Sequence, residues 1–140
     1  MPYTLGPAAD PMAIAEQQYG TAATVQFTQF TSCIGLLGYN GGQVTGVHLV
    51  MVSNDDTVFD NQAADLAVQA LGVYTSVVVI GETDLWEANV GAAYNYLLGL
   101  LNNSVIIETG DGIYGGRVEN GVPQYWDQPD GTAGQYVDVP

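Results

Sequence analysis

The chain has 140 residues, of which 47% are hydrophobic, so it is large and apolar enough to form a core without disulfides or a structural metal. One arginine, Arg117, stands against fifteen acidic residues and no lysine, which gives a formal net charge of -14. This charge repels phosphate backbones and anionic lipids, so we expect no nucleic-acid partner. The apolar runs are too short for a membrane span, and none is expected.

The N-terminal residues 1–21 carry three of the six prolines and are predicted to form an irregular arm, either mobile or packed at a sheet edge. They lack a basic region followed by a long apolar core, so a cleavable secretory signal is not expected. The localisation stays open between the cytoplasm and secretion by a route without such a signal. Residues 22–140 are predicted to form a single α+β domain.

Three strands are predicted before the first helix, over residues 22–30, 33–39 and 44–52, because these segments are rich in Val, Thr, Leu and Phe. The turn Asn40-Gly41-Gly42 separates the second strand from the third and supplies the positive φ angles of a tight hairpin. The residues on either side of this turn are therefore expected to pair in antiparallel order.

Two helices with one strand between them are predicted in the middle of the chain. The first runs from a cap at Asp60 or Asn61 to about residue 71, and the second covers residues 83–101. The strand between them, over residues 74–80, is rich in β-branched residues and is expected to be buried. Apolar residues at helical spacing form the core-facing stripe of the second helix, namely Trp86, Val90, Ala93, Leu97 and Leu101.

After the second helix we expect a strand over residues 104–108 and a hairpin of residues 113–118 and 122–126, closed by Asn120-Gly121. The last residues, rich in Gly, Asp and Pro, are predicted to be frayed. The order β, β, β, α, β, α, β, β, β favours an α+β fold rather than a doubly wound one. We expect a mixed, mostly antiparallel β-sheet or sandwich with the two main helices packed on one side.

Cys33 and His48 are the only cysteine and the only histidine, and they lie on the two strands of the Asn40-Gly41-Gly42 hairpin. The turn brings them within a residue or two of mutual register. A neighbouring imidazole takes the proton of a thiol, whose ordinary pKa of roughly 8.5 keeps it protonated at neutral pH. The pair is a candidate nucleophile and base. The alternative from the residues alone is a buried apolar cysteine and a structural histidine.

Two stretches carry a resemblance to a known family. Residues 31–52, TSCIGLLGYNGGQVTGVHLVMV, resemble the segment by which chemoreceptor glutamine deamidases of the CheD family present their catalytic cysteine and histidine. Residues 103–121, NSVIIETGDGIYGGRVENG, look like a late segment of the same family. The separation of cysteine and histidine is also similar to that in the cytotoxic necrotizing factor toxins, which share the fold and deamidate glutamine in host GTPases.

The resemblance implies a cysteine-dependent protein-glutamine deamidase, with Cys33 as nucleophile, His48 as general base and acid, and a protein as substrate. Thr28 is the nearest match to the threonine that assists the histidine in the CheD family. It is offset by one residue, which turns it to the opposite strand face unless a bulge intervenes. The toxins orient their histidine with a backbone carbonyl instead.

Two other functions stay open at this point. The charge fits a non-enzymatic acidic binding module, such as an inhibitor or immunity protein with a basic protein partner. The abundance of Gly, Ala, Thr, Asn and Tyr fits a structural, self-associating domain. We expect no cofactor and no metal, because neither a second cysteine nor a second histidine is present to build a zinc site.

Overall fold

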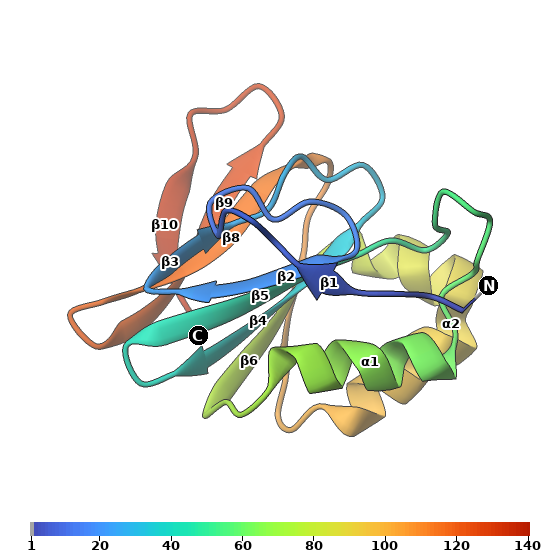
Figure 1. Ribbon diagram of the computed structural model, residues 1–140. Helices are drawn as coiled ribbons and strands as arrows, with labels where there is room; N and C mark the ends of the chain where they lie inside the picture. Colours follow the sequence, from blue (N-terminus) through green and yellow to red (C-terminus); the bar gives the residue numbers. More distant parts are fainter. Residues whose placement is uncertain (1) are drawn as a thin grey trace.

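A computed structural model describes residues 2–140 and shows two packed β-sheets with two helices beside them (Figure 1). In the larger sheet the strand order is β1-β2-β5-β4-β6-β7, and in the smaller it is β10-β9-β8-β3. The strands of the larger sheet are β1 (Gly6–Pro7), β2 (Gln18–Ala22), β5 (Gln43–Leu49), β4 (Ile34–Asn40), β6 (Ser76–Gly81) and β7 (Val105–Glu108). Those of the smaller sheet are β10 (Gln135–Asp138), β9 (Val122–Pro129), β8 (Gly112–Glu119) and β3 (Thr24–Gln26).

The predicted α+β class is confirmed, because most strand pairs are antiparallel and both helices lie on one side of the larger sheet (Figure 1). Only β1 with β2 and β6 with β7 pair in parallel among the described strands. The helices are α1 (Asn61–Leu71) and α2 (Thr83–Leu100). Neither is long and apolar enough to cross a membrane, and the part of the chain described here has no other helix.

The first helix begins where its sequence predicts. The Asp60 carboxylate accepts a hydrogen bond from the backbone N–H of Ala63 at 2.8 Å, which satisfies one of the free donors of the first turn. The second helix departs from the regular pattern at Val90, where φ is -132° and ψ is 40°. This kink interrupts the predicted apolar stripe of α2, and Val90 is only half-buried although Trp86 and Leu97 are fully buried.

The hairpin of β4 and β5 forms as predicted. Its register runs from Asn40 opposite Gln43 to Ile34 opposite Leu49, and Gly41 takes a positive φ of 60° in the turn. Because β4 also pairs with β6, this hairpin lies in the middle of the larger sheet. It forms the rigid base on which Cys33 and His48 are positioned.

The two chain ends both contribute edge strands. Of the two outcomes predicted for the N-terminal arm, packing at a sheet edge is found, since residues 2–21 contribute β1 and most of β2 at the edge of the larger sheet, and Ile14 bridges to Phe27. The end predicted to be frayed contains β10, which pairs with β9. Backbone pairing with a neighbouring strand stabilises both segments in spite of their Gly and Pro content.

The two faces of β4 pack against different layers. A Cβ on Gly38 would lie 2.8 Å from the Leu71 side chain of α1, so the even-numbered residues of β4 face the helices. A Cβ on Gly116 of β8 would meet the side chains of Leu37 and Tyr39, so the odd-numbered residues face the smaller sheet. Side chains of the second kind line the interior of the sandwich.

Candidate functional site

Cys33 lies immediately before β4, on a backbone that is fixed from the helix side. Ser32 has a φ of 68°, which is uncommon for a residue other than glycine. Trp86 of α2 donates from Nε1 to the Ser32 carbonyl at 3.0 Å, and the N–H of Glu82 donates to the Cys33 carbonyl at 3.2 Å. Gly81 allows this approach, because a Cβ there would lie 2.4 Å from the Cys33 carbonyl oxygen. The start of α2 therefore sets the position of the thiol.

His48 lies in β5 directly opposite Gly35, and it is fully buried. Its ring packs against Phe30, with ring centroids 4.8 Å apart, and against Phe27 at 5.5 Å. A Cβ on Gly35 would meet the same two phenylalanine rings, so glycine leaves the space that they fill. The imidazole therefore points into the interior between the two sheets.

Cys33 and His48 lie on the same face of the hairpin. Cys33 is two residues before Gly35, the partner of His48, and alternate residues of a strand share a face. Cys33 precedes the first paired residue of β4, so we infer its position as a diagonal neighbour of His48 by extending the strand alternation by one residue. No hydrogen bond joins them, since His48 Nε2 has no partner within residues 2–140. The Sγ of Cys33 instead lies 3.8 Å from Oε2 of Glu16 and 3.8 Å from the Thr31 carbonyl oxygen.

One ring nitrogen of His48 is held by the backbone. Nδ1 lies 2.8 Å from the carbonyl oxygen of Ile14, which can only accept a hydrogen bond. We therefore assign the proton of the neutral ring to Nδ1 and a lone pair to Nε2. Over residues 2–140, Nε2 is the single buried side-chain nitrogen or oxygen without a hydrogen-bond partner. Leaving it unpaired costs about 1–3 kcal/mol, so this atom calls for a functional explanation.

Thr28 contributes to this arrangement through its backbone. Its N–H donates to the same Ile14 carbonyl at 2.9 Å, whereas no hydrogen bond joins its hydroxyl to His48. Thr28 lies in a bend beyond the end of β3, so strand alternation does not decide the direction of its side chain. The hydrogen-bond partner of His48 Nδ1 is the Ile14 carbonyl and not the Thr28 hydroxyl.

Burial is the main cause of the shifted pKa values of Cys33 and His48. Burial, with a smaller contribution from the Glu16 carboxylate and against the lowering effect of the Thr31 backbone, raises the pKa of the Cys33 thiol to about 12. Burial also lowers the pKa of His48 below 6.5, although the Ile14 carbonyl and Glu16 oppose this shift. At neutral pH the resting pair is therefore a neutral thiol and a neutral imidazole, the second of which is able to accept a proton.

A small pocket of about 170 Å³ reaches the thiol from outside. Cys33 contributes to its lining together with Glu16, residues 31–32 and residues 50–52. Cys33 as a residue is only 1% exposed, whereas Glu16, which also lines the pocket, is exposed. Glu16 was missed at the sequence level, because its proximity to Cys33 depends on a tertiary contact that no local pattern records.

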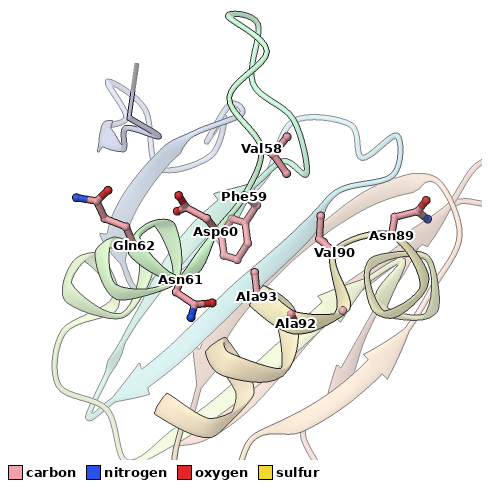
Figure 2. Close-up of a pocket in the computed structure, with 10 residues that line it drawn as sticks. Val58, Phe59, Asp60, Asn61, Gln62, Asn89, Val90, Ala92 and Ala93 are labelled. Atoms are coloured by element: carbon pink, nitrogen blue, oxygen red, sulfur yellow. The ribbon is translucent and has the colours of Figure 1, made fainter.

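A larger pocket than the one at Cys33 lies elsewhere. A pocket of about 550 Å³ opens between the start of α1 and the kink of α2, where Val90 and Ala93 face Phe59 and Asp60 (Figure 2). Its lining contains neither Cys33 nor His48 and is mainly apolar. The residue at the break of α2, Val90, forms part of the wall of this pocket.

Metal-ligating side chains do not gather at either pocket, and no group of three or more His, Cys, Asp or Glu able to hold an ion is found within residues 2–140. Compared with protein-family models, with curated proteins and with solved structures, the chain matches none of them. Its function has to be inferred from the site itself.

Proposed function

We propose that the protein is a cysteine-dependent protein-glutamine deamidase, with Cys33 as nucleophile and His48 as general base and acid. The observation that carries the proposal is the state of His48 Nε2. A backbone carbonyl holds Nδ1, which leaves Nε2 as an unpaired acceptor on the sheet face that Cys33 shares. A fixed imidazole with a free lone pair beside a thiol is the arrangement that nucleophilic catalysis requires.

In the first half of the reaction, Nε2 takes the thiol proton and the Cys33 sulfur attacks the carboxamide carbon of a glutamine side chain. A C–S bond forms, and the carbonyl oxygen gains negative charge. The His48 imidazolium then donates its proton to the amide nitrogen, the C–N bond breaks and ammonia leaves. The product is a thioester on Cys33.

In the second half, water attacks the thioester while Nε2 accepts one of its protons. The C–S bond breaks, the thiol recovers a proton from His48, and a glutamate side chain is released. One water is consumed and one ammonia is formed for each glutamine. The scheme requires Nε2 and the sulfur to come within hydrogen-bond distance when substrate binds, and catalytic hydrogen bonds often tighten only in the complex.

The negative oxygen of the intermediates needs hydrogen-bond donors. The backbone N–H of Cys33 is suited to this role, because none of the backbone hydrogen bonds found for residues 2–140 uses it as donor. The positive φ of Ser32 and the contacts from Trp86 and Glu82 fix the direction of this N–H before substrate arrives. Such preorganisation is the main source of oxyanion stabilisation in enzymes.

The proposal is tested by alkylating Cys33 with iodoacetamide, itself a small carboxamide, and following the intact mass under native conditions. Cys33 is the only cysteine, so the reaction has one product. We expect His48→Gln to slow labelling by about 10²-fold or more, because the variant lacks the base. Asn40→Gln, at the far end of the same hairpin, is the control and should keep the wild-type rate.

Equal labelling rates for the wild type and His48→Gln would contradict the proposal, provided that circular dichroism shows both to be folded. Ammonia release from glutamine-rich proteins, coupled to glutamate dehydrogenase, then identifies substrates. Cys33→Ala removes any release that belongs to this site.

A second function, an acidic non-enzymatic binding module, is favoured by one observation. Cys33 is 1% exposed and the pKa of its thiol is raised to about 12, which is the state of an inert, buried cysteine. In that case Cys33 reacts with iodoacetamide only after denaturation, in the wild type and in His48→Gln alike. The same experiment therefore separates the two functions.

A further inference from the structure

Glu16 occupies a defined position at the mouth of the Cys33 pocket. Its Oε2 lies 3.8 Å from the Cys33 sulfur, and its side chain is exposed to solvent. The backbone on both sides is fixed, since the N–H of Gln17 donates to the His48 carbonyl at 2.9 Å and the Ile14 carbonyl binds the His48 ring. The carboxylate therefore lies at the mouth of the pocket, close to the Cys33 thiol.

Within residues 2–140, this carboxylate forms no salt bridge. The only salt bridge within residues 2–140 joins Arg117 to Glu119, at 3.6 Å, and both belong to β8. The chain has no lysine, and its single imidazole is bound to Ile14. An unpaired carboxylate at a pocket entrance is a ready partner for a cation that arrives with a ligand.

The charge of Glu16 also acts on the thiol beneath it. The carboxylate opposes formation of the thiolate, because two negative charges would lie close together. A cation bound to Glu16 removes this repulsion. Binding of a suitable ligand and activation of the thiol are thereby linked through one side chain.

Resting on the proposed deamidase function, we propose that Glu16 determines specificity by binding a lysine or arginine side chain that lies beside the target glutamine. The substrate class is then a glutamine on a basic protein surface. The overall charge of -14 supports this assignment, since it attracts a basic partner over a longer range before the local contact forms.

The test compares two methanethiosulfonate reagents of opposite charge, one bearing a trimethylammonium group and the other a sulfonate group. Each forms a mixed disulfide with the Cys33 thiolate and releases methanesulfinate, so the two reactions differ only in the charge that approaches the site. We expect the cationic reagent to react faster with the wild type. Glu16→Gln should lower the ratio of the two rates about fivefold or more, since one nearby charge is removed.

Glu119→Gln provides the control, because it removes the same charge from the end of β8 in the smaller sheet, and Glu119 does not line the Cys33 pocket. Its rate ratio should stay close to that of the wild type. A ratio that falls equally in Glu16→Gln and Glu119→Gln, or in neither, would overturn the assignment of Glu16.

His48→Gln keeps the failure of this inference distinct from the failure of the proposed function. It should slow both reagents without changing their ratio. If His48→Gln slows them and Glu16→Gln leaves the ratio unchanged, the Glu16 inference is wrong and the Cys33–His48 pair stands. If Cys33 reacts with neither reagent in the folded protein, both proposals are wrong.

Discussion

The two faces of the β4–β5 hairpin are built on different principles. The face toward the helices is covered by α1 and α2 and is packed with hydrocarbon, as Val47 and Leu36 illustrate with no exposure at all. The face toward the smaller sheet is buried as deeply, yet it holds an imidazole nitrogen without a partner. Only the first face is explained by the requirements of a stable core.

The unpaired nitrogen of His48 distinguishes the second face from an ordinary hydrophobic core. A polar group in a core normally finds its hydrogen bonds, and the other buried side chains of residues 2–140 do so. His48 has one bond to Ile14 and lacks the second, beside a cysteine on the same face. The unpaired Nε2 lowers the stability of the folded state, and a local loss of stability is a common property of catalytic sites.

Substitutions of neighbouring residues on the two faces are expected to change the free energy of unfolding in opposite directions. Val47 and His48 are adjacent in β5, both fully buried, and they point in opposite directions. We expect Val47→Ala to lower the free energy of unfolding by about 2 kcal/mol, since it removes buried methyl groups and leaves a cavity. His48→Leu should instead raise it by about 1 kcal/mol, because it removes the unpaired nitrogen while the Ile14 carbonyl keeps the N–H of Thr28.

Urea denaturation at pH 7.5, followed by circular dichroism, measures both variants against the wild type. A loss of stability in His48→Leu as large as that in Val47→Ala would show that the imidazole is a structural core group. The contrast between the two faces would then be lost, and with it the main support for the base.

A smaller effect follows from the pH dependence of stability. The folded-state pKa of His48 is lowered from 6.5, so the unfolded state binds a proton more readily than the folded state. The contribution of the neutral ring to stability is complete above pH 6.5 and is lost as the pH falls below it. At pH 6 the wild type should have lost up to about 1 kcal/mol relative to His48→Leu, compared with pH 7.5.

Taking the difference between two proteins removes the contribution of other titrating groups, such as Glu82, whose pKa is raised mainly by burial and which both proteins share. Urea midpoints at the two pH values provide the measurement. A difference that does not change with pH, or that changes in the opposite direction, would show that His48 is charged or solvated in the folded state.

Much of the fold was predictable because it depends on local signals. Asp60 caps α1 and Asn40-Gly41-Gly42 closes the central hairpin, and both follow from the conformations that these residues prefer. The strands at the chain ends were not predicted, for the opposite reason. Residues 6–7 and 135–138 lie in segments rich in Gly, Asp and Pro, and pairing with β2 and β9 decides their conformation.

The candidate site divides in the same way. The diagonal placement of Cys33 and His48 followed from counting residues around one turn. The Ile14 carbonyl that binds His48, and the Glu16 carboxylate beside the thiol, come from a segment that precedes the hairpin and packs across it. Only tertiary structure brings that segment to the site, so no spacing rule identifies it.

The claim that His48 Nε2 carries a free lone pair is tested most directly by ¹⁵N NMR of protein labelled in the imidazole ring, which reports the protonation of each ring nitrogen. One histidine gives one pair of ring signals, so no assignment by mutation is needed. At neutral pH we expect Nδ1 to carry the proton and Nε2 to show the shift of an unprotonated ring nitrogen. A proton on Nε2, or on both nitrogens, would contradict the claim that His48 offers a free lone pair on the face that it shares with Cys33.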